Sequence, residues 1–339
     1  MADKFSFALR VACLLFAAGL LACSSEEDRP NDTTAAPLSE VFRNKVVETS
    51  LDGIPGNLVS SLREIGANTN IPATAALYAP TFTKSYFAGF NINRDIAYGP
   101  APRNVLDVFT TNSTAQNRPV VVFVHGGGFG GGNKNSATSP FYDNIPAWVA
   151  TQGMVGVNIN YRYAPANTWP AGIEDMRALV AWLKTNIAQY GGNPNQIFLW
   201  GKSTGASHVA DYIADIERKG EDEQVAGAIL SSGFYLLGQE PVWQAYYGDD
   251  VSLYPSRNAL SGLLSTDTPI FVSYAEFDGD MYKEQFKLLL EAMDSAAKRV
   301  DALYLRGHSH MSETYAVGST DETLTGPVLA FIRRVSTAM

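Results

Sequence analysis

A serine stands between two glycines in the segment "GKSTG", Gly201 to Gly205, directly after the apolar run "QIFLW". The pattern G-x-S-x-G between a strand and a helix is typical of a nucleophilic serine, because the sharp turn exposes the hydroxyl at a helix N-terminus. Gly201 and Gly205 leave room where strand and helix nearly touch. Ser203 is therefore the predicted nucleophile, and the chemistry that it indicates is acyl transfer.

A serine hydroxyl is a poor nucleophile near neutral pH unless a base takes its proton and an acid orients that base. Of the four histidines, His125 lies in a glycine-rich stretch and His208 lies one helical turn past Ser203, so both are expected to be structural. His308 and His310, in "GHSHM", follow the apolar run "ALYL" and are expected on a loop at a strand's carboxyl end. Sterics alone does not choose between them.

The acid is expected after another strand. The run "PIFVSYA" is followed by "EFDGD", which offers three carboxylates: Glu276, Asp278 and Asp280. A serine, then an acid, then a histidine is the chain order of α/β-hydrolases and differs from that of two other serine protease lineages.

The stretch "VVVFVHGGGFGGG", Val120 to Gly132, ends an apolar run with one histidine and then six glycines in seven residues. Each glycine costs roughly 0.5–1 kcal/mol relative to alanine inside regular structure, so a close backbone approach is implied. Acyl transfer creates an oxyanion that needs N–H donors at about 2.7–3.1 Å. The predicted donors are the amides of Gly127, Gly128 and Thr204, with Gly126 as the substitute if the register differs by one.

The elements that must position these residues follow a rhythm from Asn104 onward. Apolar, β-rich runs alternate with helical patterns; the runs are "NVLDVF", "VVVFV", "MVGVNIN", "QIFLW", "AGAILSS", "PIFVSYA" and "ALYL". The clearest helical pattern repeats every three or four residues from Ile173 to Tyr190. These features predict an α/β fold, with a mostly parallel central sheet covered by helices on both faces and sites at the carboxyl ends of strands.

Residues 38–89 carry no recognisable chemistry and are expected to form a small cap or flank. Within them, "LSEVFRNKVVETSL" and "GNLVSSLREIG" predict short amphipathic helices, and "NIPATAALYAPTF" predicts a loop. The predicted hydrolase domain as a whole spans residues 38–339.

The N-terminus has the composition of a targeting segment. Lys4 and Arg10 precede or flank an apolar run that is too short to span a bilayer comfortably, and this run ends at "LLAC" before an abruptly polar stretch. The pattern resembles a bacterial lipoprotein signal, with residues 1–22 removed, Cys23 lipidated and residues 23–37 as a linker. The alternative is an ordinary secretory signal with an incidental cysteine. Ser24 resembles outer-membrane sorting, so we expect a lipid-anchored protein of the bacterial cell envelope.

Bulk composition limits the partners. The 339 residues are 46% hydrophobic and 17% charged, enough for one large globular domain. Net charge is -9, with 25 Lys and Arg against 34 Asp and Glu and no basic cluster, which argues against nucleic acid. Membrane contact is expected through the lipid anchor only, and the sequence does not indicate an oligomeric state.

The motifs "VHGGGFGGGNK", "NYRYAPANTWPAGIEDMRALVAWLK", "YGGNPNQIFLWGKSTGAS", "YAEFDGD" and "GHSHM" resemble those of the HGGG-type esterases, in the carboxylesterase and hormone-sensitive-lipase branches of the α/β-hydrolases. The resemblance implies hydrolysis of a small-molecule carboxylic ester with no cofactor or metal. It places Ser203 on the nucleophile, Asp278 on the acid and His310 on the base, since that base usually follows G-x-x and precedes Met or Phe. "YRYAP", Tyr161 to Pro165, matches a structural motif that braces the site.

Four positions depart from the resemblance: Lys202, Thr204, Ala206 and Gly279 stand where Glu, Asp or Gln, then Ala, Gly and Pro are frequent. None removes a catalytic group, but they weaken inference about the substrate. Trp243, Tyr246 and Tyr247 could equally line an acyl or alcohol pocket or be plain core. Short-chain or aryl esters are the expected substrates. The alternatives are an amidase or arylformamidase with the same triad, and a non-catalytic, surface-displayed binding protein of the same fold.

Overall fold

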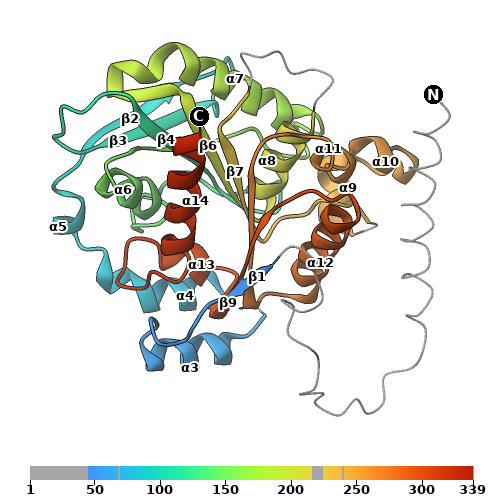
Figure 1. Cartoon of the computed structure of the whole chain (residues 1–339), viewed down its shortest axis with the longest axis horizontal. Helices are drawn as coiled ribbons and strands as arrows, with labels where there is room; N and C mark the ends of the chain where they lie inside the picture. Colours follow the sequence, from blue (N-terminus) through green and yellow to red (C-terminus); the bar gives the residue numbers. More distant parts are fainter. Residues whose placement is uncertain (1–44, 68, 216–223, 239, 339) are drawn as a thin grey trace.

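The structure, a computed structural model, describes residues 45–67, 69–215, 224–238 and 240–338. The expected signal segment 1–22, Cys23 and the linker 23–37 lie outside the described residues. Within the described part, nine strands form one sheet in the order β1-β9-β8-β7-β6-β4-β5-β3-β2 (Figure 1).

Most neighbouring strands of this sheet are parallel. The parallel set comprises β1 (Val46–Glu48), β4 (Arg118–Val124), β5 (Val155–Ile159), β6 (Gly192–Lys202), β7 (Gly227–Ser231), β8 (Ile270–Phe277) and β9 (Asp301–Ser309). At the other edge, β3 (Val105–Thr110) pairs antiparallel with both β5 and β2 (Asn91–Ala97). All seven strands predicted from apolar runs are present, so the expected mostly parallel sheet is confirmed.

Helices cover both faces of the sheet. One face packs against α7 (Ala171–Asn186), α8 (Thr204–Ala214), α11 (Leu260–Leu263) and α12 (Asp280–Ser295); the other packs against α6 (Asn144–Thr151) and α14 (Thr325–Ala338). The remaining helices are α3 (Gly56–Ile65), α4 (Ile71–Tyr78), α5 (Lys84–Phe87), α9 (Pro241–Tyr247), α10 (Tyr254–Arg257) and α13 (Ser312–Tyr315). Among the described residues, no helix has the length and apolar character needed to cross a membrane.

The continuous apolar runs of the strands follow from burial on both faces. In β4, Val120, Val122 and Val124 join the core under α7 and α8, whereas Val121 and Phe123 join the core under α6 and α14. Because successive side chains of a strand point to opposite faces, a strand covered on both faces needs apolar residues at every position.

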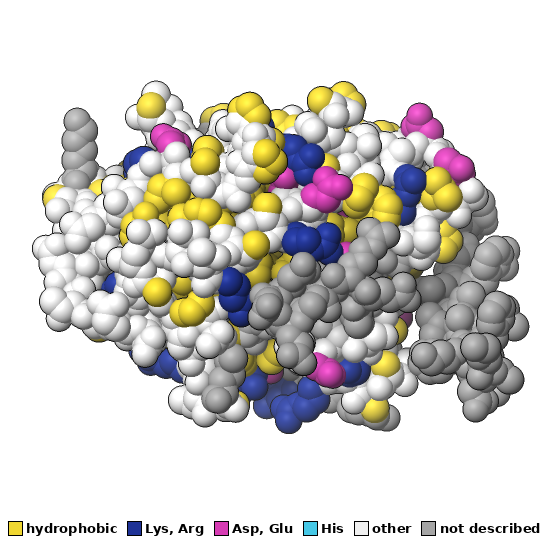
Figure 2. Space-filling model, turned by 90° about the horizontal axis from the view of Figure 1, so that it is seen from above, with side chains coloured by type: hydrophobic (Ala, Val, Ile, Leu, Met, Phe, Trp, Pro, Cys, Tyr) yellow, Lys and Arg dark blue, Asp and Glu magenta, His cyan; other side chains and the backbone are white. Residues whose placement is uncertain are grey.

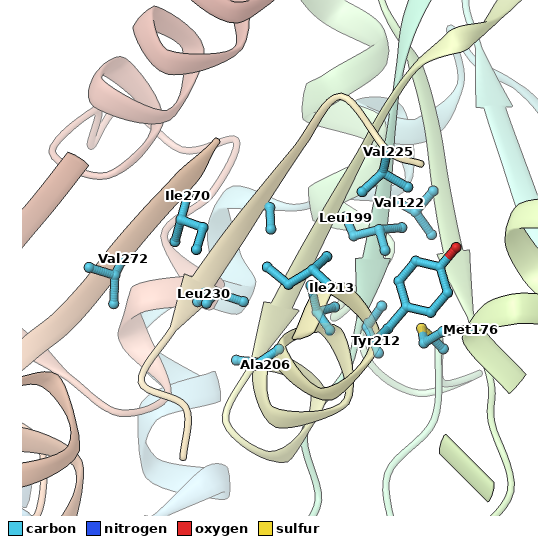
Figure 3. Close-up of a cluster of buried hydrophobic side chains, with 14 of the residues drawn as sticks. Val122, Met176, Leu199, Ala206, Tyr212, Ile213, Val225, Leu230, Ile270 and Val272 are labelled. Carbon is cyan, nitrogen blue, oxygen red and sulfur yellow. The ribbon is translucent and has the colours of Figure 1, made fainter. Parts of the chain in front are cut away.

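The first of these cores fixes the helix that follows Ser203. Ala206, Tyr212 and Ile213 of α8 lie against Leu199 of β6 and Leu230 of β7 (Figure 3). This packing holds the start of α8 at the carboxyl ends of the central strands, where the sequence places the site.

The flanking segment differs from the expectation at two points. "VVE" forms β1, a parallel edge strand paired with β9, where a helix was expected; three residues gain strand geometry only from that partner, which lies far away in the sequence. "IPATAALY" forms α4 where a loop was expected, because Asn70 caps the helix by accepting from the Ala73 N–H at 3.1 Å. The helix expected at "GNLVSSLREIG" is confirmed as α3.

Candidate active site

Ser203 occupies the turn between β6 and α8. Its φ and ψ are 55° and -126°, in a region that side-chain-bearing residues rarely adopt. A Cβ at Gly201 would lie 2.4 Å from Ala206 Cα, and one at Gly205 would lie 2.2 Å from the Val124 carbonyl oxygen. The two glycines of the motif are therefore required by the close approach of strand and helix.

Asp278 and His310 meet beside this turn, from the ends of β8 and β9. His310 Nδ1 lies 2.7 Å from Asp278 Oδ1, and both side chains are buried. Asp278 Oδ2 accepts from the Ala275 amide and from the Ser232 hydroxyl, each at 2.8 Å. This geometry leaves Nε2 of His310 as the imidazole nitrogen available to Ser203.

The charge states suit a base and its orienting acid. Burial disfavours ionised Asp278, but the charge of Lys202 and the hydrogen bond from His310 outweigh it and lower the pKa of the carboxyl below its usual range. Burial, with the Lys202 charge, also lowers the pKa of His310. His310 is therefore neutral near pH 7 and can accept a proton.

The other candidates for acid and base have different partners. His308 lies within β9, whereas a loop position was expected, because the strand continues to Ser309. Its Nδ1 lies 3.0 Å from Ser312 Oγ, and its Nε2 lies 2.8 Å from Thr323 Oγ1. Glu276 accepts from the Gly307 amide at 2.7 Å, and Asp280 begins α12 at the surface.

The glycine loop approaches the serine closely. A Cβ on Gly126 would lie 2.9 Å from Ser203 Cβ, so only glycine fits without displacement. Gly127 and Gly128 have φ of 141° and 63°, which glycine adopts readily, and a Cβ on Gly127 would lie 2.2 Å from the Gly131 carbonyl oxygen. The amides of Gly127, Gly128 and Thr204 remain the predicted oxyanion donors.

His125, His208 and the "YRYAP" segment, Tyr161 to Pro165, pack next to the glycine loop. The Tyr161 hydroxyl donates to the His125 carbonyl at 2.7 Å, and the two rings stack with centroids 4.5 Å apart. Burial lowers the pKa of His125 to about 4 and that of His208 to about 3, so both stay neutral. No histidine is visible on the face drawn in Figure 2, and all four are buried.

The three aromatic residues proposed for a pocket lie in the interior. Trp243, Tyr246 and Tyr247 of α9 are all buried. The Tyr246 hydroxyl accepts from the Gly172 amide and the Tyr247 hydroxyl donates to Asp211, each at 2.8 Å. These are the contacts of packed core, the second of the two interpretations of this segment.

Tyr282, in the first turn of α12, is a site residue that sequence reasoning missed. Its ring stacks on His310 with centroids 4.3 Å apart. Burial raises the pKa of its hydroxyl, and the Ser203 side chain opposes that rise. Its other ring neighbour is Phe234, at 5.1 Å. The sequence feature that could have identified Tyr282 as a site residue is its position four residues after Asp278, the predicted acid.

A serine at a strand-to-helix turn, with an Asp–His pair at the ends of two neighbouring parallel strands, is the arrangement typical of the α/β-hydrolase fold. The BD-FAE family model matches residues 106–229, which include the glycine loop and Ser203. Esterase LipQ of Mycobacterium tuberculosis is 30% identical over 241 residues, 64% of this chain and 56% of LipQ. Isoprenylcysteine alpha-carbonyl methylesterase ICME of Arabidopsis thaliana is 34% identical over 170 residues, 48% of this chain and 39% of ICME.

Solved structures share the fold. Esterase B from Lactobacillus rhamnosis superposes with a TM-score of 0.67 at 16% identity, over 83% of this chain and 96% of that one. A bacterial heroin esterase superposes with a TM-score of 0.58 at 24% identity, over 82% and 92%. The chain spans about half or less of the two curated relatives. The chain has the α/β-hydrolase fold, and the curated relatives that it matches are named as esterases.

Proposed function

We propose that the protein hydrolyses carboxylic esters through an acyl-enzyme on Ser203. The observation that carries the proposal is the 2.7 Å contact between His310 Nδ1 and Asp278, beside the strained turn that presents Ser203. Asp278 fixes the imidazole so that Nε2 faces the nucleophile. This is the arrangement that a serine needs for activation.

The reaction runs in two halves. Ser203 Oγ attacks the ester carbonyl while His310 Nε2 takes its proton, and the amides of Gly127, Gly128 and Thr204 stabilise the oxyanion. His310 then gives the proton to the departing alcohol, which leaves an acyl group on Ser203. Water, activated by the same imidazole, releases the acid and restores the serine.

We propose short-chain or aryl esters as the substrates. Two aromatic rings lie next to the base: Tyr282 stacks on His310, and Phe234 stacks on Tyr282 with centroids 5.1 Å apart. Aromatic rings favour offset-stacked and edge-to-face partners, so a flat aryl group or a short acyl chain suits these surroundings.

The test compares p-nitrophenyl acetate and butyrate with the matched anilides. Ser203→Ala is expected to lower kcat by roughly 10³-fold or more. Ser207→Ala is the matched control, since Ser207 is a buried serine of the same helix whose hydroxyl accepts from the Phe234 amide at 3.1 Å. Unchanged turnover in Ser203→Ala would contradict the mechanism. Faster anilide cleavage would favour the amidase, and no turnover of either substrate would favour the binding protein.

We also propose that Cys23 carries a lipid anchor in the bacterial envelope, at the outer membrane. The support is the short apolar run ending in "LLAC", followed by a polar stretch. Mass measurement of the mature N-terminus is the test, with a diacylated Cys23 expected. Cys23→Ala should release the domain from membranes with kcat unchanged. A free N-terminus at another residue would overturn the proposal.

A further inference from the structure

Lys202, one residue before the nucleophile, is a buried cation that the proposed mechanism does not use. It is 1% exposed. Its ammonium forms an ion pair with Glu313 of α13 and donates to Ser232 Oγ at 2.9 Å. A buried charge is tolerated only when it is paired and hydrogen-bonded, and Lys202 meets both conditions directly behind the triad.

Ser232 connects this ion pair to the acid of the triad. Its Oγ lies 2.8 Å from Asp278 Oδ2 and 2.8 Å from Glu313 Oε2. The hydroxyl has a single proton, so it donates to one carboxylate at a time while Lys202 donates to its oxygen. Two carboxylates and one ammonium therefore converge on one serine. The other oxygen of Glu313, Oε1, accepts from Ser273 Oγ at 2.5 Å.

The charges of this group balance only while His310 holds a proton. In the resting enzyme Lys202 cancels Glu313, Asp278 is ionised and His310 is neutral, which leaves one net negative charge. When His310 takes the serine proton, the net charge becomes zero. Two phenols are further titratable neighbours of the group: Tyr282 of α12 stacks on His310, and Tyr235 lies in the field of Asp278 and Glu313.

Without Lys202, two buried carboxylates would act together on His310. The imidazole would then be easier to protonate, so a smaller fraction of it would be free to act as a base. The Lys202 charge lowers the pKa of His310, whereas Glu313 and Asp278 raise it. Lys202 and Glu313 thus act on the base in opposite directions.

We propose that Lys202, Glu313 and Ser232 are positioning residues that hold the Asp278 carboxylate in place, and that the charge of Lys202 offsets that of Glu313 at His310. This inference rests on the proposed function, because it assigns a task to residues behind the proposed triad. A purely structural ion pair would lose stability when either partner is replaced, whereas a pair that also holds Asp278 in place through Ser232 should make kcat sensitive to Ser232→Ala.

The experiment measures the ionisation of His310 in Lys202→Met and Glu313→Gln by two methods. One is the acid limb of kcat/KM for p-nitrophenyl acetate, which reports the base of the free enzyme. The other is NMR titration of the His310 imidazole, assigned by its loss in His310→Asn, which needs no turnover. In Lys202→Met we expect the midpoint of the His310 titration to rise by at least about half a pH unit. In Glu313→Gln we expect it to fall by a similar amount.

Three further variants complete the design. The double variant Lys202→Met with Glu313→Gln, which removes both charges, should return the midpoint close to that of the wild type. Lys134→Met is the matched control: Lys134 is 2% exposed and paired with Asp107 at 2.7 Å, outside the described contacts of the triad, and should leave the midpoint unchanged. Ser232→Ala should lower kcat about tenfold with KM unchanged. Its control is Ser207→Ala, a buried serine whose hydroxyl contacts the Phe234 amide and not Lys202, Glu313 or Asp278.

Midpoints that stay in place, or that move in the same direction in both single variants, would overturn the inference. If the single variants do not fold, Ser232→Ala decides, and an unchanged kcat in that variant would overturn it. The failure of the proposed function would look different. Ser203→Ala would then retain ester turnover, while the NMR titration would still report whether Lys202 and Glu313 set the ionisation of His310.

Discussion

The molecule contains two buried His–Asp pairs whose histidines are only two residues apart. His310 Nδ1 lies 2.7 Å from Asp278, and His308 Nε2 lies 3.2 Å from Asp321. In the first pair, His310 is 6% exposed and lies next to Ser203. In the second pair, His308 is fully buried, and its two ring nitrogens contact the hydroxyls of Ser312 and Thr323.

The difference shows that a His–Asp pair alone does not make a base. His310 keeps one nitrogen available and faces Lys202, Tyr282 and the nucleophile turn. Both nitrogens of His308 are already used to tie the end of β9 to residues 312 and 321–323, so it has no capacity for proton transfer to substrate. The same chemical pair therefore supports catalysis in one place and fold in the other.

The largest expected effect separates the two histidines directly. His310→Ala should lower kcat by roughly 10³-fold or more, since the nucleophile loses its base. His308→Ala should lower kcat about tenfold at most, within the usual effect of a residue that supports a site. Steady-state kinetics on p-nitrophenyl butyrate measures both. The reverse ranking would move the base to His308.

The two acids give the next comparison. Asp278→Asn should lower kcat by about 10³–10⁴-fold, because an amide no longer stabilises the imidazolium or selects its tautomer. Asp321→Asn should change kcat only a few-fold but reduce the free energy of unfolding by about 1–3 kcal/mol, since a buried ionic contact is weakened. Urea unfolding and kinetics on the same preparations separate the two outcomes. Equal losses of kcat would contradict the division of roles.

The features that could be predicted from the sequence are those determined by short segments of the chain. Ser203 and the glycine loop are recognisable because the steric demands at Gly126, Gly201 and Gly205 appear as fixed residue types within short motifs. The strands of a sheet buried on both faces are likewise recognisable as continuous apolar runs. The acid and the base were chosen among three carboxylates and two histidines through resemblance to a family, and the contact between Asp278 and His310 agrees with that choice.

What the sequence could not predict depends on distant partners. The strand β1 exists only through its pairing with β9, and β9 extends past the expected end so that His308 faces the interior. Lys202 was visible as a departure from the family, but its partner Glu313 lies on a helix that follows the base. Tyr282 is recognisable as a site residue only once α12 places it over the imidazole.

Tyr282 distinguishes the two pairs further. Of the two histidines His308 and His310, only His310 has an aromatic ring stacked on it among the described contacts. Tyr282→Phe keeps the ring and removes only the hydroxyl, so kcat should change only about two- to fivefold. Tyr282→Ala also removes the stacking and should lower kcat about tenfold. Equal effects of the two substitutions would show that the ring does not position the base. The comparison uses kcat for a short-chain and an aryl ester.

The smallest expected effect is a pH dependence of stability confined to the second pair. Asp321 is buried, which opposes ionisation, but the imidazole of His308 beside it and two hydrogen bonds from Thr323 outweigh burial and lower the pKa of this carboxyl in the folded state. A depressed folded pKa stabilises the protein above the unfolded value of about 3.9, and this contribution is lost as pH falls through the folded value.

Asp321→Asn removes that contribution, so its deficit in unfolding free energy should be full near pH 6 and shrink below about pH 4. Urea unfolding at pH 3, 4, 5 and 6 measures the deficit directly. Asp280→Asn is the control, because Asp280 is exposed and its nearest cation, Lys283, lies 3.9 Å away. Exposed pairs of this kind contribute about 0–1 kcal/mol, so its deficit should stay small at every pH. A deficit in unfolding free energy for Asp321→Asn that persists undiminished to pH 3 would show that the contact with His308 depends on packing and not on the charge of Asp321. The two pairs would then differ in electrostatics as well as in access to the nucleophile.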